Sequence, residues 1–569
     1  MHWYHIMGDY DDLTNTKALL QESDHPKLLC RGIFLRPLPQ GRRIYCILLQ
    51  LLLLNFVGEV IQIFFQFFLA RHLKAEPLPT YIIPFSISYM LCLPMGFIAD
   101  RYFGRAKVLY YSWILLFVAQ LTFSVYFVVA SFIFNESLHI VSYILLIPAF
   151  LIHSFGMAGV RVNLIPFGVD QMRTASSDEL SSYFHWYYWC RNVGYLLAYS
   201  VGASFVVTSK YELIALLISS AAATIGVVIN ILGYNWFIKR EKIGNPLLLI
   251  YGVLRYAVTA NRPAERSAFS FDGRPKPSRI DLAKQTHYGI YRDEKVEDVK
   301  TFLRILVFLV SLIGFLCVYS LLGNVYIQQA AYFQQPKQFF TEETIKCPPG
   351  CNISEVTIHQ LHSFYSLNWT LLFNILAVFI IIPILDRVVY PLCYPRMLTR
   401  LGVGVVVCLS SVICALSIEA VCYHNFLSQS EPHVNVFHYI QMFSVTIPIW
   451  VIAPQFIIQG LAECLVFITM VEFIYAQSPA YMKGLLLGCL FFIQGLAMTL
   501  GSLLVFSQLY GHSKYWEYFK LVPSGSDQWC RVKEVDSGSG LAAYVSTAII
   551  IILGIVLFLY SARKYKIRI

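Results

Sequence analysis

Four ionisable side chains of opposite charge lie inside long apolar stretches of this sequence. They are the carboxylates of Glu59 and Glu463 and the guanidinium groups of Arg161 and Arg191. Burying a charge in apolar surroundings costs free energy unless the charge is paired or binds a ligand. These two acids and two bases can therefore form ion pairs that fix a helical bundle, line a cavity that binds a charged solute, or do both.

Amide and hydroxyl side chains accompany these charges at helical spacing. Side chains that share a helix face recur every three or four positions, and six apolar stretches carry such polar faces. Because lipid cannot satisfy polar groups, we expect these faces to meet at one central cavity. Hydrogen bonding between helices is the alternative, and it is our interpretation for Gln66 and Gln328. The candidate cavity positions are Asn55, Glu59, Gln62, Arg161, His185, Tyr188, Arg191, Asn192, Tyr195, Ser320, Asn374, Gln455, Gln459 and Glu463.

The sequence does not predict an enzyme. No nucleophile is spaced with a base, and no group of residues has the spacing of metal ligands. We therefore expect no cofactor, with protons as the one species that buried carboxylates could exchange.

Composition and hydropathy predict a membrane protein. Of the 569 residues 57% are apolar and 13% are charged, and the mean hydropathy is +0.60. Soluble domains carry about 25% charged residues. A helix needs roughly 20 apolar residues to cross a bilayer. We expect an all-α membrane protein with twelve transmembrane helices in two six-helix bundles, at 44–70, 80–99, 108–133, 139–164, 185–208, 212–237, 302–327, 364–385, 400–421, 446–475, 484–508 and 541–561.

Basic residues gather in the loops on one side of these helices. Residues 238–301 hold thirteen Lys or Arg, and smaller basic groups follow the second, eighth and twelfth helices. Cytoplasmic loops are rich in Lys and Arg, so both termini are predicted to be cytoplasmic. The net charge of +10 therefore indicates membrane topology and not nucleic acid. No cleavable signal peptide is expected before the first helix. The predicted organisation is an N-terminal tail at 1–43, a bundle at 44–237, a cytoplasmic linker at 238–301, a second bundle at 302–561 and a cytoplasmic tail at 562–569.

The loops on the opposite side carry features of an extracellular or lumenal surface. Asn135 and Asn352 begin N-glycosylation sequons. Cys347 and Cys351 bracket a CPPGC turn and could form a disulfide, although other cysteines on this side could compete.

Two short motifs in the N-terminal tail fit sorting signals. YDDL, from Tyr10 to Leu13, fits a tyrosine-based signal, and DHPKLL, from Asp24 to Leu29, fits an acidic dileucine signal. They predict trafficking adaptors as partners, and either the plasma membrane or an endolysosomal membrane as the location.

Motifs along nearly the whole chain resemble one family. GFIADRYFGRAK, at 96–107, resembles the gating motif of the major facilitator superfamily. FGVDQM at 167–172 and YFHWYYWCRNVG at 183–194 are similar to the signature of the proton-coupled oligopeptide transporter family. IGNPL, VEDVK, IPILDRVVYP and LAECLVFITMVEFIYAQSPAYMK extend the resemblance, which is strongest to solute carrier family 15. The gating positions it implies are Asp100, Arg101, Gly104, Arg105 and Lys107.

The resemblance implies a site for small peptides or similar zwitterions. Asn192 and Asn374 stand where the family binds the peptide backbone. Glu463 matches the acid that receives the amino terminus, and Arg161 stands where a Lys faces the carboxylate. Tyr188 shares the helix face of Asn192 and joins this set. A zwitterion requires such a cation and anion with amides between them.

The first span departs from the family pattern. Where the family has ExxERFxYY, this chain has NFVGEVIQI from Asn55 to Ile63, so Glu59 replaces the Arg and Gln62 replaces a Tyr. Ser320 stands where related animal members have a proton-linked Asp. The four cavity charges sum to zero, whereas the family pattern is net negative. We hypothesise that Glu59 pairs with Arg161 or Arg191 and that proton coupling is weakened or rerouted.

The leading interpretation is a secondary transporter of small peptides or similar zwitterions that works by alternating access in a lipid bilayer. One alternative is a scaffold or receptor that kept the fold without transporting. Another is a facilitative carrier for a different small organic solute.

Overall fold

The computed structural model describes most of the chain. The described residues are 41–72, 85–132, 138–172, 175–202, 212–239, 245–260, 278–321, 325–330, 333–334, 340–346, 355–361, 369–393, 395–428, 433–437, 440–511 and 539–565.

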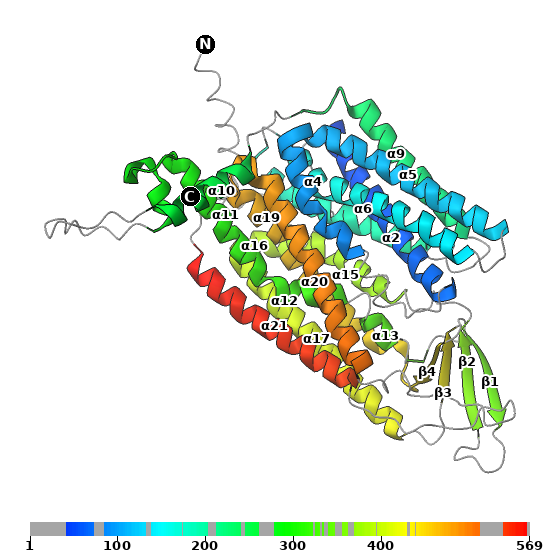
Figure 1. The fold of residues 1–569 in the computed structure, drawn as a ribbon. Coiled ribbons are helices and arrows are strands. Elements are labelled where there is room, and N and C mark those ends of the chain that lie inside the picture. The colour runs from blue at the N-terminus through cyan, green and yellow to red at the C-terminus, as the bar shows by residue number, and fades with distance from the viewer. Residues whose placement is uncertain are drawn as a thin grey trace.

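The helices form two groups that lie side by side, with a smaller group of linker helices at one end and a small sheet at the other (Figure 1). We call these ends the linker end and the sheet end. The first group contains α2 (Arg42–His72), a helical segment at 85–90, α4 (Cys92–Ile98), η2 (Ala99–Phe103), α5 (Arg105–Phe132), α6 (Leu138–Asp170), α7 (Ser177–Leu197), η3 (Ala198–Gly202) and α9 (Glu212–Gly233).

The second group begins after the linker. The linker elements are α10 (Pro246–Thr259), η4 (Ile280–Ala283) and η5 (Gln285–His287). The second group contains α11 (Asp293–Ser311), α12 (Ile313–Leu321), α13 (Ile327–Ala330), α15 (Leu371–Ile384), η8 (Leu385–Val389), α16 (Tyr390–Cys393), α17 (Met397–Ser428), η9 (Ile449–Ile452), α18 (Ala453–Glu463), η10 (Cys464–Ile468), α19 (Thr469–Gln477), η11 (Ala480–Met482), α20 (Lys483–Gly511) and α21 (Ser539–Lys564).

The described helices are those of a multi-pass membrane protein. Nine are long and apolar enough to cross a bilayer, and α11 with α12 makes a tenth if the pair is one span bent by 45°. Each of the twelve predicted runs overlaps a described helix. The helical membrane architecture is therefore confirmed, while the count of twelve and the orientation of the termini stay predictions.

Capping residues in the sequence mark where α7 and α10 begin in the structure. At the start of α7, Ser176 and Glu179 form a reciprocal capping box, in which the Glu179 side chain accepts from the Ser176 N–H at 2.8 Å. At the start of α10, the Asn245 side chain accepts from the N–H of Leu248, and Pro246 takes a first-turn position that needs no donor.

Glycine residues bring the two groups into backbone contact along α4 and α20. A Cβ on Gly488 would lie 2.9 Å from the Cα of Leu93, and one on Gly96 would lie 2.7 Å from the carbonyl oxygen of Gly484. Side chains at these positions would separate the helices, so the close approach depends on glycine. The groups also meet where α7 packs on α15.

A four-stranded sheet at the sheet end corrects the expectation of an all-α chain. Two antiparallel hairpins, β1 (Phe340–Lys346) with β2 (Glu355–Leu361) and β3 (His433–Phe437) with β4 (Ile440–Ser444), come from distant loops. They join through parallel pairing of β2 with β3, from Thr357 opposite His433 to Gln360 opposite Val436. The β-branched residues of these loops carry a local strand signal, but the hydropathy pattern that finds membrane helices does not reveal it.

Four charges tie the linker to α11. Lys284 Nζ lies 2.9 Å from Asp281 and 2.5 Å from Glu297, and Lys300 also contacts both carboxylates. Burial alone would raise the pKa of Asp281, but hydrogen bonds from Lys300, Ser278 and Lys284 outweigh it and hold this pKa well below its usual range.

We expect this network to hold the linker independently of pH in the physiological range. Because the pKa of Asp281 is depressed in the folded state, its stabilisation is complete above the unfolded value of about 3.9 and is lost only as pH falls below it. Hydrogen exchange at residues 280–283 should therefore be similarly protected between about pH 5 and pH 8 after correction for intrinsic rates. Asp281→Asn should speed this exchange severalfold, whereas Glu294→Gln, which removes an exposed acid, should not. Equal exchange in both variants would contradict the assignment.

Candidate functional site

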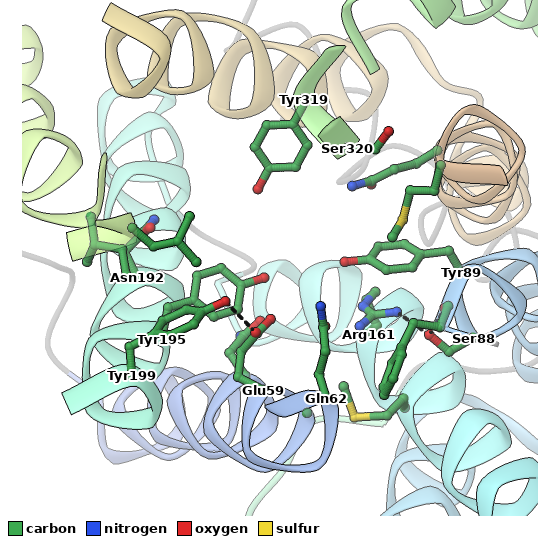
Figure 2. Close-up of a pocket in the computed structure, with 18 of the residues that line it drawn as sticks. Glu59, Gln62, Ser88, Tyr89, Arg161, Asn192, Tyr195, Tyr199, Tyr319 and Ser320 are labelled. Atoms are coloured by element: carbon green, nitrogen blue, oxygen red, sulfur yellow. Dashed lines mark hydrogen bonds between the residues drawn. The ribbon is translucent and has the colours of Figure 1, made fainter. Parts of the chain in front are cut away.

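A cavity lies between the two helix groups. Figure 2 shows polar side chains from both groups directed into it. The first group contributes charged and hydroxyl-bearing side chains from α2, segment 85–90, α6, α7 and η3. The second contributes residues of α12, α15, α18 and α20. The polar lining residues are Asn55, Glu59, Gln62, Ser88, Tyr89, His153, Arg161, Asn192, Tyr195, Tyr199, Tyr319, Ser320, Asn374, Glu463 and Gln494.

A second, smaller chamber adjoins this cavity on its linker side. The two share Asn55, Tyr89 and Arg161 as lining residues. Along α7 the lining passes from Tyr195 in the larger chamber to Arg191 in the smaller one, which is one turn nearer the linker end. We call them the sheet-side chamber and the linker-side chamber.

Glu463 joins the two groups at the cavity floor. Its carboxylate accepts a hydrogen bond from the hydroxyl of Tyr188, which lies on α7 in the other group, and one at 3.3 Å from Tyr319. With the Asn374 amide oriented so that both its atoms are satisfied, its nitrogen donates to the other carboxylate oxygen at 3.3 Å and its oxygen accepts from the Gly460 N–H. Glu463 is therefore buried and held by neutral donors.

Arg161 lies on the opposite wall. Its guanidinium carbon is 3.8 Å from the centre of the Tyr89 ring, and one nitrogen donates to the Ser88 hydroxyl at 3.2 Å. A guanidinium over an aromatic face is held by the ring quadrupole and keeps its remaining N–H groups for other acceptors.

The expected contact ion pairs of Glu59 are not formed. Glu59 accepts a hydrogen bond at 3.0 Å from the Tyr199 hydroxyl. Arg191 donates twice to the Tyr195 hydroxyl, at 3.1 and 3.0 Å. Figure 2 shows Glu59 on the side of Tyr195 and Tyr199, away from Arg161. The hypothesis of a direct pair is therefore wrong for this conformation, because tyrosine hydroxyls and rings occupy the positions next to each charge.

The other predicted cavity residues divide into two sets. His185, Gln455 and Gln459 line neither chamber, so the prediction that they face the cavity is wrong: His185 lies 3.7 Å from Asp386, and Gln455 donates to Gln329 at 3.0 Å, because partners on neighbouring helices take up these polar groups.

Asn55, Asn192 and Ser320 do line the cavity. Asn55 and Asn192 donate to the carbonyl oxygens of Leu51 and Tyr188, each four positions earlier in the same helix. Ser320 donates to the carbonyl oxygen of Cys317, three positions earlier. Gln62 is half-buried and points into the sheet-side chamber (Figure 2). Their remaining oxygen atoms can accept hydrogen bonds from a bound molecule.

The predicted gating motif divides into a buried network and an exposed part. Arg105 donates to Asp170 at 2.8 Å and to Asp100 at 3.1 Å. Gly104, at φ +81°, makes the turn between η2 and α5 in a conformation that side chains disfavour. Arg101 and Lys107 are exposed.

Two aspartates, Asp100 and Asp386, lie at matching ends of the two groups. Asp100 in η2 packs against the backbone of Gly484, where a Cβ would lie 2.3 Å from its carboxylate. Asp386 in η8 lies 3.7 Å from Nδ1 of His185 on α7. Each acid thus contacts the other group, and together with the hydrogen bond from Tyr188 to Glu463 these contacts join the two groups on the linker side of the cavity. Local π-helical turns, often found at functional sites, carry both acids.

Several functional positions were not singled out from the sequence. Tyr89, Ser88, Tyr199 and Tyr319 hold the cavity charges, and Asp170 completes the Arg105 network. Tyr199 continues the spacing of Tyr195 by one turn, so the helical pattern could have included it. The others carry no local signal, because their partners come from other helices.

Some predicted features lie outside the described residues. These are the sequons at Asn135 and Asn352, the cysteines Cys347 and Cys351, and the sorting motifs at Tyr10–Leu13 and Asp24–Leu29. The side chains of Gln66 and Gln328 are also outside them.

Two groups of apolar helices that enclose a charged cavity are the architecture in which secondary transporters hold their substrate sites. The sequence profile of the POT family, PTR2, matches residues 107–341 and 363–515, more than half of the chain. The chain therefore belongs to the POT family, and the resemblance of its motifs is confirmed.

Curated relatives are distant. Solute carrier family 15 member 3 of Rattus norvegicus is 23% identical over 365 residues, which cover 62% of this chain and 60% of that protein. Solute carrier family 15 member 5 of Homo sapiens is 28% identical over 240 residues, which cover 41% of this chain and 40% of that protein. The chain thus matches less than two thirds of the length of these relatives.

Solved structures share the fold. An auto-inhibited POT family peptide transporter superposes with a TM-score of 0.64 at 16% identity, covering 93% of this chain and 98% of that one. A POT family transporter in complex with a thioalcohol conjugated peptide superposes with a TM-score of 0.57 at 11% identity, covering 92% and 97%.

We expect Arg105 to be needed for stability and its neighbour Arg101 not to be. Removing the buried guanidinium in Arg105→Gln takes its ion-pair contacts away from two buried carboxylates, which costs roughly 3 kcal/mol. Arg101→Gln removes an exposed charge and should cost about 0.5 kcal/mol or less. The measurement is the temperature at which half of the detergent-purified protein remains monodisperse. Similar losses in both variants would show that the buried network does not stabilise the fold.

Proposed function

We propose that this protein is a secondary transporter of di- and tripeptides or similar zwitterions, working by alternating access. The observation that carries the proposal is the placement of Arg161 and Glu463 in different helix groups, facing one cavity. A zwitterion can neutralise both charges at once, with its carboxylate at Arg161 and its ammonium at Glu463. Asn192 and Asn374 line the space between them and can accept or donate hydrogen bonds to a peptide backbone.

The hydrogen bond from Tyr188 to Glu463 suggests how binding could drive opening. It connects the two groups at the linker side of the cavity. A solute ammonium that binds Glu463 competes with the Tyr188 hydroxyl, which weakens one contact holding the linker end closed. A ligand shifts a conformational equilibrium by its difference in affinity for the two states, and this competition supplies such a difference.

We propose that proton coupling is weaker than the family name implies. Glu59, Arg161, Arg191 and Glu463 sum to zero charge, so the empty site has less need to take up protons than a net negative one. We propose no cofactor for this mechanism, with protons as the ion that could be co-transported.

We propose twelve membrane spans, with both termini and the linker in the cytoplasm. Residues 238–301 carry thirteen Lys or Arg, and loops rich in these residues face the cytoplasm. Asn135 and Asn352 are then available for glycosylation, and Cys347 and Cys351 for oxidation. The tail motifs suggest adaptor-dependent sorting to the plasma membrane or to endolysosomal membranes.

We expect Glu463→Gln to lower uptake of labelled dialanine into liposomes by about tenfold or more, because a neutral amide loses the charge-assisted contact to the ammonium. Asp178→Asn, which removes an exposed acid at the start of α7, is the matched control and should transport normally. Uptake should be followed with and without an imposed proton gradient. A gradient that leaves the initial rate unchanged fits weak coupling, and a strong dependence contradicts it.

The same proteoliposomes distinguish the alternative functions. Dialanine that stabilises the purified protein against heat without crossing the membrane would favour a receptor or scaffold. Transport of a different solute, without stabilisation by dialanine, would favour a facilitative carrier.

A further inference from the structure

Neither cavity arginine has a carboxylate partner among the described residues. Arg161 contacts the Tyr89 ring and the Ser88 hydroxyl. Arg191 contacts the Tyr195 hydroxyl and the rings of Tyr188, Tyr195 and Phe467, with its guanidinium carbon 5.3, 5.3 and 5.6 Å from their centres. Both charges are therefore held by neutral groups.

The two cavity acids are also held by neutral groups. Glu59 accepts from Tyr199, and Glu463 accepts from Tyr188 and Tyr319. The cations and anions of the cavity are thus kept apart, although the protein could have lowered its electrostatic energy by pairing them directly. The arrangement leaves two guanidinium groups facing internal space with N–H donors that a ligand could use.

The two arginines meet at the linker-side chamber. Arg161 lines both chambers, and Arg191 lines only the linker-side chamber, together with Tyr188 and Phe467. A solute whose carboxylate binds Arg161 therefore lies at the boundary, next to a small chamber that contains a second cation. An acidic side chain would enter this chamber with movement of the side chains that line it.

Carboxylates bind guanidinium groups more strongly than aromatic rings do. A cation–π contact contributes about 0.5–2 kcal/mol, whereas a bidentate Arg–carboxylate pair adds two charge-assisted hydrogen bonds. An acid entering the linker-side chamber would therefore improve on the contacts Arg191 makes in the empty protein. A neutral side chain would gain no comparable contact.

We propose that the linker-side chamber is a second anion subsite, in which Arg191 binds an additional acidic group of the solute. The inference rests on the proposed transport of zwitterions and narrows its substrate class to solutes with two acidic groups, such as acidic dipeptides. In this arrangement Arg161 binds one carboxylate, Glu463 binds the ammonium, and Arg191 selects for the second carboxylate.

The test compares two dipeptides of equal shape and different charge, alanyl-glutamate and alanyl-glutamine, by isothermal titration of the purified protein at about pH 7. The wild type should bind alanyl-glutamate about tenfold or more tightly than alanyl-glutamine, as expected for one charge-assisted contact. Arg191→Gln should abolish this preference and leave alanyl-glutamine binding within about twofold. Arg191→Lys keeps the charge and should retain part of the preference.

Arg304→Gln is the matched control, because it removes an exposed arginine of α11 and changes the net charge equally. It should leave the preference intact. Thermal unfolding of each variant separates loss of binding from loss of folding. If Arg191→Gln does not fold, Arg191→Lys and the preference of the wild type still decide the inference.

The outcomes separate this inference from the proposed function. Equal binding of both dipeptides by the wild type would overturn the second subsite and leave zwitterion transport standing. Binding of neither dipeptide would overturn the proposed function, and glutarate, a diacid without an ammonium, then tests the chamber alone. Stabilisation by glutarate that depends on Arg191 would support the subsite, and its absence would overturn it.

Discussion

The structure depends on holding four charged side chains inside a low-dielectric bundle without direct ion pairs between them. Glu463 illustrates how this is done. Its carboxylate is held by hydroxyl and amide donors from three helices, including Tyr188 from the opposite group. Neutral donors offset part of the desolvation cost of the charge and leave it able to exchange a partner for a ligand. Tyrosine serves here because its apolar ring packs in the bundle while its hydroxyl reaches the charge.

Buried charges at the linker end are arranged differently from those of the cavity. There the charges are paired directly, as Arg105 is with Asp100 and Asp170. Asp100 and Asp386 reach across to the other helix group, Asp100 at Gly484 and Asp386 at His185. Directly paired charges stabilise the contact between the groups, whereas charges held by neutral donors can exchange those donors for a ligand. The two ends of the cavity lining therefore treat buried charge in chemically different ways.

Much of this organisation could be predicted from single segments. The apolar runs located the helices, and the spacing of Asn55, Glu59 and Gln62 placed all three on one face, which the structure directs into the cavity. The motif around Asp100 indicated a gate. The partners of these residues could not be predicted in the same way. Nothing near Glu59 in the sequence identifies Tyr199 as its donor, 140 positions away. The sheet was missed for a related reason, because β2 and β3 pair across two distant loops.

The sequence by itself determined which segments are helical, which faces are polar and how many charges of each sign must be accommodated. These are local properties, set by hydropathy and by the helical repeat. Only the tertiary structure decided that Arg161 lines both chambers, that Arg191 lines the linker-side chamber, and that tyrosines, not acids, contact them. The physical reason is that electrostatic partners are selected by distances of a few ångströms. Such distances are fixed by the packing of helices remote in sequence, which no single segment encodes.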